Sequence, residues 1–321
     1  MPDAMQDIAV IGAGAWGSAL AVLNARAGRR VTLCARSAQT ATAMRDTRHA
    51  PRLPGVALPE NLHITEVPPR AEIYLLAVPT QHLRATMARL ELAPAPRVLC
   101  CKGLETATLC LPPEITDLHP AAVLTGPNFA QEVAAGLPAA AVLATPDSSL
   151  RARLIAGLKT DTLRLYGSAD MLGAALGGAA KNVIAIAAGA VMGAGLGENA
   201  RAALITRGLA EIARLAQALG GRAETISGLS GLGDLLLTCT GPGSRNFSLG
   251  LALGQGQSLA DILATRSGVT EGVTTAPALL ARATQAGVEM PIVQAVTTLL
   301  ANKMNIAETM TYLMGRALKD E

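Results

Sequence analysis

Four charged side chains stand isolated in apolar stretches of this sequence, and their types could carry proton transfer and anion binding. Lys181 is the sole charge in the run from Met171 to Gly197. Asp234 and Arg245 are likewise the only acidic and the only basic residue in their own neighbourhoods, and Lys102 ends the apolar segment RVLCCK. Charged residues are seldom buried unless they are paired or functional. These four therefore predict a site, although each could also be a structural ion.

A lysine in apolar surroundings suits proton transfer to and from a carbonyl oxygen. Burial and neighbouring cations generally lower the pKa of a lysine, which lets the amine exchange a proton near neutral pH. We therefore expect Lys181 to act as the catalytic acid and base, Asp234 to orient its ammonium group and Lys102 to polarise the substrate oxygen. Methionine keeps the length and apolar volume of Lys181, so the sequence predicts that a Lys181→Met variant still folds and can even gain stability.

Two glycine-containing turns indicate where an anion binds. In the first, GPGSRN, Arg245 is flanked by Ser244 and Asn246. A guanidinium fork beside further hydrogen-bond donors is a common way to bind phosphate. The second turn lies in TGPNFAQEVA, where Asn128 is the predicted N-cap of the following helix. The substrate that these residues indicate is small, anionic and carbonyl-bearing.

A glycine motif near the start of the chain indicates a dinucleotide cofactor. The segment IAVIGAGAWG places Gly12, Gly14 and Gly17 at G-x-G-x-x-G spacing after an apolar run, and a helical segment follows. Between a strand and a helix, these glycines permit a tight turn, close approach of a pyrophosphate and close packing. The helix N-terminus adds free N–H groups and the positive end of its dipole. An uninvolved turn can have the same spacing, but this setting favours dinucleotide binding.

The residue after the second predicted strand bears on the choice between NAD and NADP. NAD sites usually carry Asp or Glu there. In this chain no acidic residue occurs between Asp7 and Asp46, and Arg36 stands at that place. A cation there can bind a 2′-phosphate, so NADP is admissible and Arg36 favours it. The alternative is that Arg36 is only a solvated surface residue.

The order of the predicted elements gives the fold class. Strand-like and helical segments alternate up to residue 168, which predicts a doubly wound parallel sheet. From about Ala169 onward, helical periodicity replaces the strand signals. We therefore predict an α/β fold with a Rossmann-type dinucleotide-binding domain in residues 1–168 and an all-α substrate-binding and catalytic domain in residues 169–321. The run from Met171 to Gly197 is interpreted as a buried helix, because a membrane span would not suit its glycines and its central lysine.

Composition excludes several other classes of protein. The chain has 321 residues and a formal net charge of +3, without a basic cluster interleaved with aromatic residues, so nucleic-acid binding is not expected. The five cysteines are odd in number and show no C-x-x-C spacing, which indicates reduced thiols and a cytoplasmic protein. The four histidines lie far apart, and we predict no metal site. The first residues, MPDAMQD, show no export signal.

Six motifs together resemble one enzyme family over nearly the whole chain. In chain order they are GAGAWGSALA, CCKGLE, TGPNFAQEVAAGLP, AAKNVIAIAAG, GLSGLGDLLLTCTGPGSRN and VTEGVTTA. This set resembles the bacterial NAD(P)-dependent glycerol-3-phosphate dehydrogenases. The resemblance implies reversible reduction of dihydroxyacetone phosphate to sn-glycerol 3-phosphate for glycerophospholipid synthesis, by a cytoplasmic homodimer that uses NADP or NAD.

The resemblance also implies roles for individual residues, with Lys181 as the proton acceptor. Besides the motif glycines, the residues that would contact the dinucleotide are Ala15, Trp16, Arg36, Lys102, Ala130, Arg245, Val269 and Glu271. Those that would contact the substrate are Lys102, Gly126, Asn128, Lys181, Asp234, Ser244, Arg245 and Asn246. Members of the family often carry Ser or Thr at the positions of Ala15 and Asn128, and Thr at that of Ser18.

Two other functions remain open at the level of sequence. A β-hydroxyacid dehydrogenase or a ketopantoate reductase would share the layout and a catalytic lysine, but GPGSRN as a phosphate site speaks against them. A non-catalytic protein that senses NAD(P) is the second alternative. Such a sensor would not need Lys181 among alanines.

Overall fold

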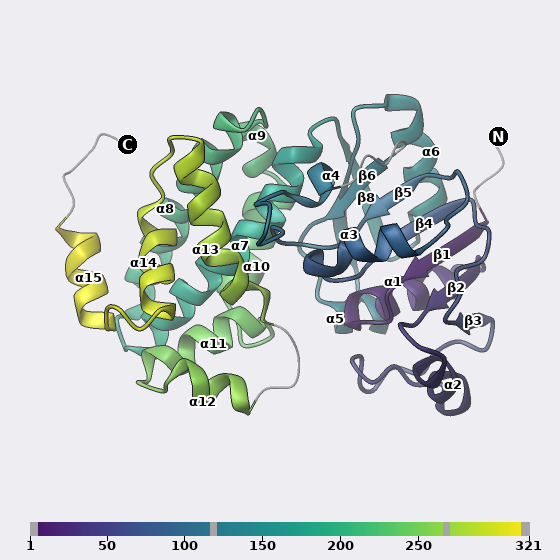
Figure 1. Cartoon of the computed structure of the whole chain (residues 1–321), viewed down its shortest axis with the longest axis horizontal. Helices are drawn as coiled ribbons and strands as arrows, with labels where there is room; N and C mark the ends of the chain where they lie inside the picture. The colour runs from purple at the N-terminus through teal and green to yellow at the C-terminus, as the bar shows by residue number, and fades with distance from the viewer. Residues whose placement is uncertain (1–5, 116–120, 266–269, 316–321) are drawn as a thin grey trace. The chain divides into compact units, whose positions relative to one another are not determined.

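A computed structural model describes residues 6–115, 121–265 and 270–315 of the chain (Figure 1). The chain forms two compact units. Unit 1 comprises residues 1–102 and 110–175, and unit 2 comprises residues 103–109 and 176–321. The passage from one unit to the other falls within helix α7 (Met171–Gly193). The predicted domain boundary, between residues 168 and 169, lies just before this helix.

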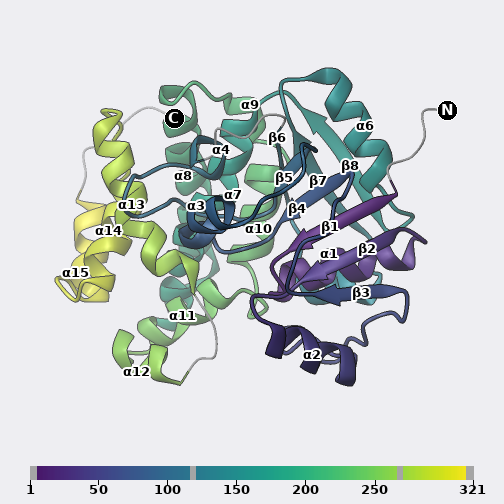
Figure 2. The same ribbon diagram turned by 45° about the vertical axis from the view of Figure 1, so that its right-hand side comes forward.

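Unit 1 is built on one eight-stranded sheet. Its strands are β1 (Asp7–Ile11), β2 (Arg30–Cys34), β3 (Leu62–Thr65), β4 (Ile73–Leu76), β5 (Arg97–Leu99), β6 (Ala121–Thr125), β7 (Ala139–Ala144) and β8 (Leu163–Ser168). Their order is β3-β2-β1-β4-β5-β6-β7-β8, so β1 lies between β2 and β4, as Figure 2 shows. The strand order reverses between β1 and β4. Ligands of such sheets bind outside the carboxyl ends of the strands at this point.

Helices connect the strands of unit 1 and cover the sheet. They are α1 (Ala15–Arg26), α2 (Ala38–Thr47), α3 (Thr80–Arg89), α4 (Pro112–Ile115), α5 (Ala130–Ala135) and α6 (Ser148–Leu158). Nine of the twelve residues of α1 are buried, most of them Ala, Leu or Val. This helix packs against α5 as well as the sheet. Because α1 is buried on nearly all sides, its packing holds the preceding glycine turn in position.

The sheet is not parallel throughout, and that part of the prediction is wrong. Strand β7 pairs antiparallel with β6, and β8 pairs parallel with β7. The connection from β6 to β7 contains the six-residue helix α5. Such a helix is about 9 Å long, against about 16 Å for a strand of five residues, so it cannot carry the chain back to where β6 began. The remaining strand pairs are parallel, and the Rossmann-type fold is confirmed.

Helices are the only regular secondary structure among the described residues of unit 2, as the periodicity predicts. After α7 come α8 (Gly197–Ala218), α9 (Ala223–Ile226), the π-helical turn η1 (Leu229–Gly233), α10 (Asp234–Cys239), α11 (Arg245–Gly254), α12 (Leu259–Ala264), α13 (Glu271–Gln285), α14 (Pro291–Leu300) and α15 (Ile306–Met314). The glycine-rich segment GAGLG separates α7 from α8, so the helical conformation is interrupted there. In both views α14 lies beside α15, and the two helices are in contact.

Helix α7 is the core helix of unit 2. Among the described residues it alone is long and apolar enough to cross a membrane, by length and composition, but 94% of its most apolar stretch is buried inside the protein. A Cβ atom on Gly189 would collide with the carbonyl oxygen of Phe247 in α11. The two helix backbones therefore touch at this crossing. Their close approach brings polar residues of α7 next to those at the start of α11.

Candidate active site

The glycine turn of unit 1 has the space that a dinucleotide needs. Gly12 follows β1 and donates its N–H to the carbonyl oxygen of Cys34 at 3.0 Å. A Cβ atom on Gly17 would collide with the carbonyl oxygen of Gly12, so glycine is required there for packing. A Cβ atom on Gly14, the N-cap of α1, would meet nothing within 4 Å. The backbone at Gly14 is therefore open to a phosphate group.

The start of α1 has the electrostatic character of an anion site. The N-cap makes no side-chain hydrogen bond, and no acidic residue lies in the first turn, which begins with Ala15 and Trp16. The N–H groups of this turn have no partner within the helix, and the helix dipole is positive there. Trp16 Nε1 is buried without a hydrogen-bond partner in the described structure. Arg36 is exposed and follows β2. In Rossmann-type folds, the residue after the second strand contacts the ribose of a bound dinucleotide.

Lys102 and Gly126 lie at the carboxyl ends of the neighbouring strands β5 and β6. Lys102 Nζ donates a hydrogen bond to the carbonyl oxygen of Gly126 at 3.2 Å. Asn128 Nδ2 donates to the carbonyl oxygen of Ala140 at 3.1 Å, and Asn128 Oδ1 is buried without a partner among the described residues. Buried polar atoms are nearly always satisfied, so an unpaired oxygen at this place fits a ligand that brings a donor.

The prediction that Asn128 caps the next helix is wrong. The N-cap of α5 is Phe129, and no side chain caps this helix, whose first residue is Ala130. Asn128 donates instead to Ala140 at the start of β7. This contact exists because β7 runs antiparallel to β6, which brings its first residues next to the turn.

In unit 2, Lys181 and Asp234 form a buried ion pair. Lys181 Nζ donates to Asp234 Oδ1, and the two residues are 7% and 0% exposed. Lys181 lies on α7, and Asp234 is the first residue of α10, directly after the π-helical turn η1. Such turns are frequent at functional sites. Of the three predicted catalytic residues, the structure thus pairs Lys181 with Asp234 within unit 2, whereas Lys102 belongs to unit 1.

Cys239, at the end of α10, is a buried thiol whose protonation is affected by this ion pair. Burial raises the pKa of Cys239 to about 12, against an opposing effect of the Lys181 charge and with a further rise from Asp234. Cys239 is therefore a neutral thiol near neutral pH and has no thiolate for nucleophilic or base chemistry. The apolar segment LLLTC already indicates a buried cysteine at this position.

Three consecutive predicted phosphate ligands lie at the N-terminus of α11. Ser244 is the N-cap, and its Oγ accepts the N–H of Phe247 at 3.2 Å, which leaves the hydroxyl hydrogen to donate. Arg245 is the first helical residue and is exposed. Asn246 is buried and donates its Nδ2 to Asn182 Oδ1 at 2.9 Å. Asn182 was not predicted as a site residue, although it is the only polar side chain beside Lys181 in the apolar run.

One predicted cofactor contact, Glu271, lies at the start of α13. Glu271 is the first residue of α13 and is half-buried. The next residue, Gly272, donates its N–H to Asn246 Oδ1 at 3.0 Å. Val269 lies outside the described residues.

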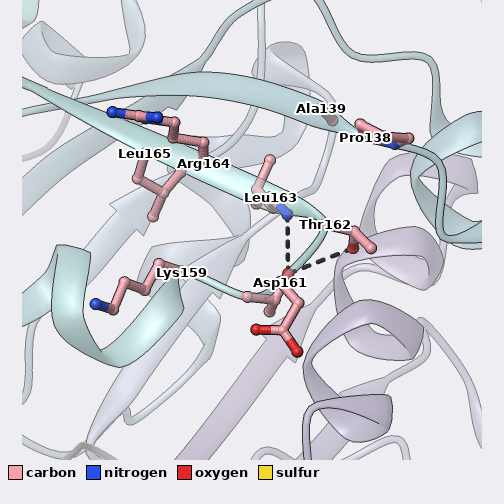
Figure 3. Close-up of a pocket in the computed structure, with 9 residues that line it drawn as sticks. Pro138, Ala139, Lys159, Asp161, Thr162, Leu163, Arg164 and Leu165 are labelled. Carbon is pink, nitrogen blue, oxygen red and sulfur yellow. Dashed lines mark hydrogen bonds between the residues drawn. The ribbon is translucent and has the colours of Figure 1, made fainter.

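Unit 1 also contains a hollow of about 430 Å³ (Figure 3). It is lined by residues at the starts of β7 and β8 and by the loop before β8, where Thr160 Oγ1 accepts the N–H of Leu163 at 3.0 Å. None of the predicted site residues lines it. Within the described ranges there is also no group of three or more His, Cys, Asp or Glu residues placed to hold a metal ion.

Comparisons with known proteins agree over both units. The family of the NAD-dependent glycerol-3-phosphate dehydrogenase N-terminus matches residues 7–151, and that of the C-terminus matches residues 170–311. The glycerol-3-phosphate dehydrogenase (NAD(P)+) of Acidiphilium cryptum is 61% identical over 98% of both chains. That of Gluconobacter oxydans is 56% identical over 96% of this chain and 97% of its own.

A solved structure is similar over the same extent. Glycerol-3-phosphate dehydrogenase from Coxiella burnetii superimposes with a TM-score of 0.90 and 36% identity, over 97% of this chain and 99% of that one. Sequence and fold thus agree from the glycine turn to the helices of unit 2. The chain belongs to the NAD-dependent glycerol-3-phosphate dehydrogenase family.

Proposed function

We propose that this chain is an NAD(P)-dependent oxidoreductase that reversibly reduces dihydroxyacetone phosphate to sn-glycerol 3-phosphate. The observation that carries the proposal is the buried ion pair of Lys181 and Asp234 in the unit that also presents Ser244, Arg245 and Asn246 at a helix N-terminus. Relatives named glycerol-3-phosphate dehydrogenase support it over a hydroxyacid dehydrogenase, a ketopantoate reductase or a sensor of NAD(P).

The residues of unit 1 fit a dinucleotide. The open backbone at Gly14 and the uncapped start of α1 suit the pyrophosphate. The turn residues Gly12, Ala15, Trp16 and Gly17 would surround it, with Arg36 near the ribose. The further contacts implied by family resemblance are Lys102, Ala130, Arg245, Val269 and Glu271. When bound, NAD(P)H supplies a hydride to the carbonyl carbon of the substrate.

Lys181 carries the proton transfer in this proposal. As the carbonyl oxygen gains negative charge, Lys181 Nζ donates a proton to it, and in the oxidation it accepts the proton of the hydroxyl group. Asp234 holds Nζ in place and balances its charge in buried surroundings, where an unpaired ion would be costly. Lys102, whose Nζ already bonds to the carbonyl oxygen of Gly126, would polarise the same substrate oxygen.

The start of α11 binds the phosphate in this proposal. Arg245 offers a guanidinium fork, Ser244 a hydroxyl hydrogen and Asn246 an amide N–H, and the helix dipole adds to them. A phosphate dianion only accepts hydrogen bonds, so a group of donors suits it. Gly126 and Asn128 would contact the rest of the substrate, with Asn128 Oδ1 as the acceptor for a hydroxyl group.

The cellular setting is proposed from the family. The sn-glycerol 3-phosphate formed would supply glycerophospholipid synthesis, and the enzyme would be a cytoplasmic homodimer. The five cysteines are thiols and not disulfides, which supports the cytoplasmic setting. Neither a nucleic acid nor a membrane span is needed by this function.

A spectrophotometric assay of the purified full chain tests the proposal. Oxidation of NADPH is followed with dihydroxyacetone phosphate, with 2-ketopantoate and with a β-keto acid as the acceptor. Turnover with dihydroxyacetone phosphate far above the other two is the expected result. A preference for either of the other acceptors would assign the chain to another dehydrogenase class. Tight NADPH binding without turnover of any acceptor would favour a sensor.

A further inference from the structure

Gly272 and two asparagines form a chain of hydrogen bonds inside unit 2. Gly272, the second residue of α13, donates its N–H to Asn246 Oδ1 at 3.0 Å. Asn246 donates its Nδ2 to Asn182 Oδ1 at 2.9 Å. Asn182 and Asn246 are only 4% and 8% exposed. These bonds join the starts of α13 and α11 to α7, at the residue next to Lys181.

A single donor decides the orientation of both side-chain amides. A backbone N–H can only donate, so Asn246 must turn its oxygen toward Gly272. The amide nitrogen of Asn246 then faces Asn182, which must accept the hydrogen bond with its own amide oxygen. The reverse orientation would place donor against donor at Gly272 and leave buried groups unsatisfied, which is costly. The N–H of Gly272 therefore fixes the amides of Asn246 and Asn182 together.

Only glycine fits at this place. The side chain of Thr270, the N-cap of α13, makes no capping hydrogen bond. Asn246 Oδ1 from α11 accepts the N–H of Gly272 and so caps the helix in place of Thr270. A Cβ atom on Gly272 would lie 2.6 Å from Asn246 Oδ1 and 2.8 Å from the carbonyl oxygen of Asn182. Both distances are below any normal contact of a Cβ atom. A larger residue would have to displace the Asn246 amide.

We propose that Gly272 is a positioning residue for the phosphate of the substrate and acts through the amide of Asn246. With its oxygen held by Gly272 and one N–H bound to Asn182, Asn246 keeps its second N–H as a donor for an anion at the start of α11. A rotated amide would present its oxygen, the negative end of its dipole, to the phosphate instead. The identity of the anion as dihydroxyacetone phosphate rests on the proposed function.

Gly272→Ala tests this role against the matched control Gly208→Ala. A Cβ atom on Gly208 in α8 would meet Ile184 Cγ2 at 2.9 Å, which is similar crowding without an amide. We expect Gly272→Ala to raise KM for dihydroxyacetone phosphate about tenfold or more with kcat changed less than about threefold, because hydrogen bonds to charged groups are worth that much affinity. Gly208→Ala is expected to lose some thermal stability at unchanged KM.

Inorganic phosphate provides a probe that does not depend on turnover. Its affinity for the wild type and for both variants is measured by isothermal calorimetry, and we expect it to fall only in Gly272→Ala. If the wild type fails to reduce dihydroxyacetone phosphate but this pattern holds, the proposed function is rejected and the positioning role is supported. A folded Gly272→Ala protein with unchanged KM and unchanged phosphate affinity overturns the role. So does a Gly208→Ala protein with the same losses.

Hydrogen exchange of the Gly272 amide covers the case in which Gly272→Ala does not fold. The amide is expected to be protected in the wild type and in Asn246→Asp, whose carboxylate still accepts its hydrogen bond. In Asn246→Ala, exchange at Gly272 should be at least about tenfold faster, as expected for the loss of one hydrogen bond. A Gly272 amide that exchanges rapidly in the wild type, or equally in all three proteins, overturns the proposal.

Discussion

Lys181 on α7 and Asp234 on α10 form a buried ion pair across 53 residues of the chain. Asp234 has no exposed surface, and Lys181 compensates its charge within the protein. Removing one partner of a buried ion pair is generally destabilising, because the charge that remains loses its compensation.

Lys181→Met should abolish most of the activity. Loss of general acid and base action typically costs about 10²- to 10⁴-fold in rate. Binding of NADPH should persist, since the glycine turn lies in unit 1, and the fluorescence of Trp16, the only tryptophan of the chain, can report it. A folded, NADPH-binding variant whose turnover stays within about tenfold of the wild type would remove Lys181 from the mechanism.

The same substitution should also destabilise the protein, unlike the expectation from the sequence alone. Methionine removes the ammonium group that pairs with the fully buried carboxylate of Asp234, and breaking a buried ion pair by removing one partner costs about 3–5 kcal/mol. A Lys181→Met/Asp234→Leu double variant replaces both charges by apolar groups and should recover most of that loss. Urea unfolding of the two variants makes the comparison. Equal stability of the single and double variants would contradict this cost of breaking the buried ion pair.

Arg245→Ala should weaken substrate binding more than the chemical step. A guanidinium paired with phosphate is charge-assisted and bidentate, so we expect KM for dihydroxyacetone phosphate to rise about tenfold to hundredfold. Arg245→Lys should recover only part of this, because an ammonium group cannot form the fork. The control is Arg214→Ala, which removes an exposed arginine from α8. Equal KM values for the Arg245→Ala and Arg214→Ala proteins would refute the phosphate clamp.

Arg36→Ala should shift cofactor preference toward NADH. The side chain is exposed at the end of β2, where no carboxylate is present to favour the ribose hydroxyls of NAD. We expect the ratio of kcat/KM for NADPH to that for NADH to fall about tenfold, mainly through NADPH. Arg52→Ala, another exposed arginine of unit 1, serves as the control. An unchanged ratio in Arg36→Ala would make Arg36 a surface residue only.

Cys34 should make the stability of the protein fall at alkaline pH. Burial raises the pKa of its thiol from 9.0 to about 12. Above pH 9 the unfolded chain releases this proton while the folded protein keeps it, so the free energy of unfolding decreases as pH rises toward 12, by at most about 1.4 kcal/mol per pH unit. The contribution is fully present below pH 9.

Urea unfolding midpoints at several alkaline pH values check this effect. Cys34→Ala should show a shallower loss of stability between pH about 8 and about 11 than the wild type. Cys101→Ala, at a half-buried cysteine, provides the comparison for the removal of a thiol. Parallel pH dependence in the wild type and Cys34→Ala would show that the Cys34 thiol does not contribute.

The sequence by itself determined the local elements and the residues that are candidates for the site. The glycine spacing after β1 predicted the strand, turn and helix that the structure has, because these features depend on residues a few positions apart. Isolated charges likewise marked Lys181, Asp234 and Arg245, since a charge in an apolar run needs a partner or a ligand. The loss of strand signals after residue 168 predicted the helical unit.

Only the tertiary structure decided which of these residues meet. The antiparallel β7, the hydrogen bond from Asn128 to Ala140 and the chain from Gly272 to Asn182 all join segments that lie apart in sequence. A side chain's partner depends on how helices and strands pack, and periodicity within one segment carries no information about that. For this reason the sequence predicted the partnership of Lys181 and Asp234 from their chemistry, whereas the hydrogen bonds that join Gly272, Asn246 and Asn182 became evident only in the fold.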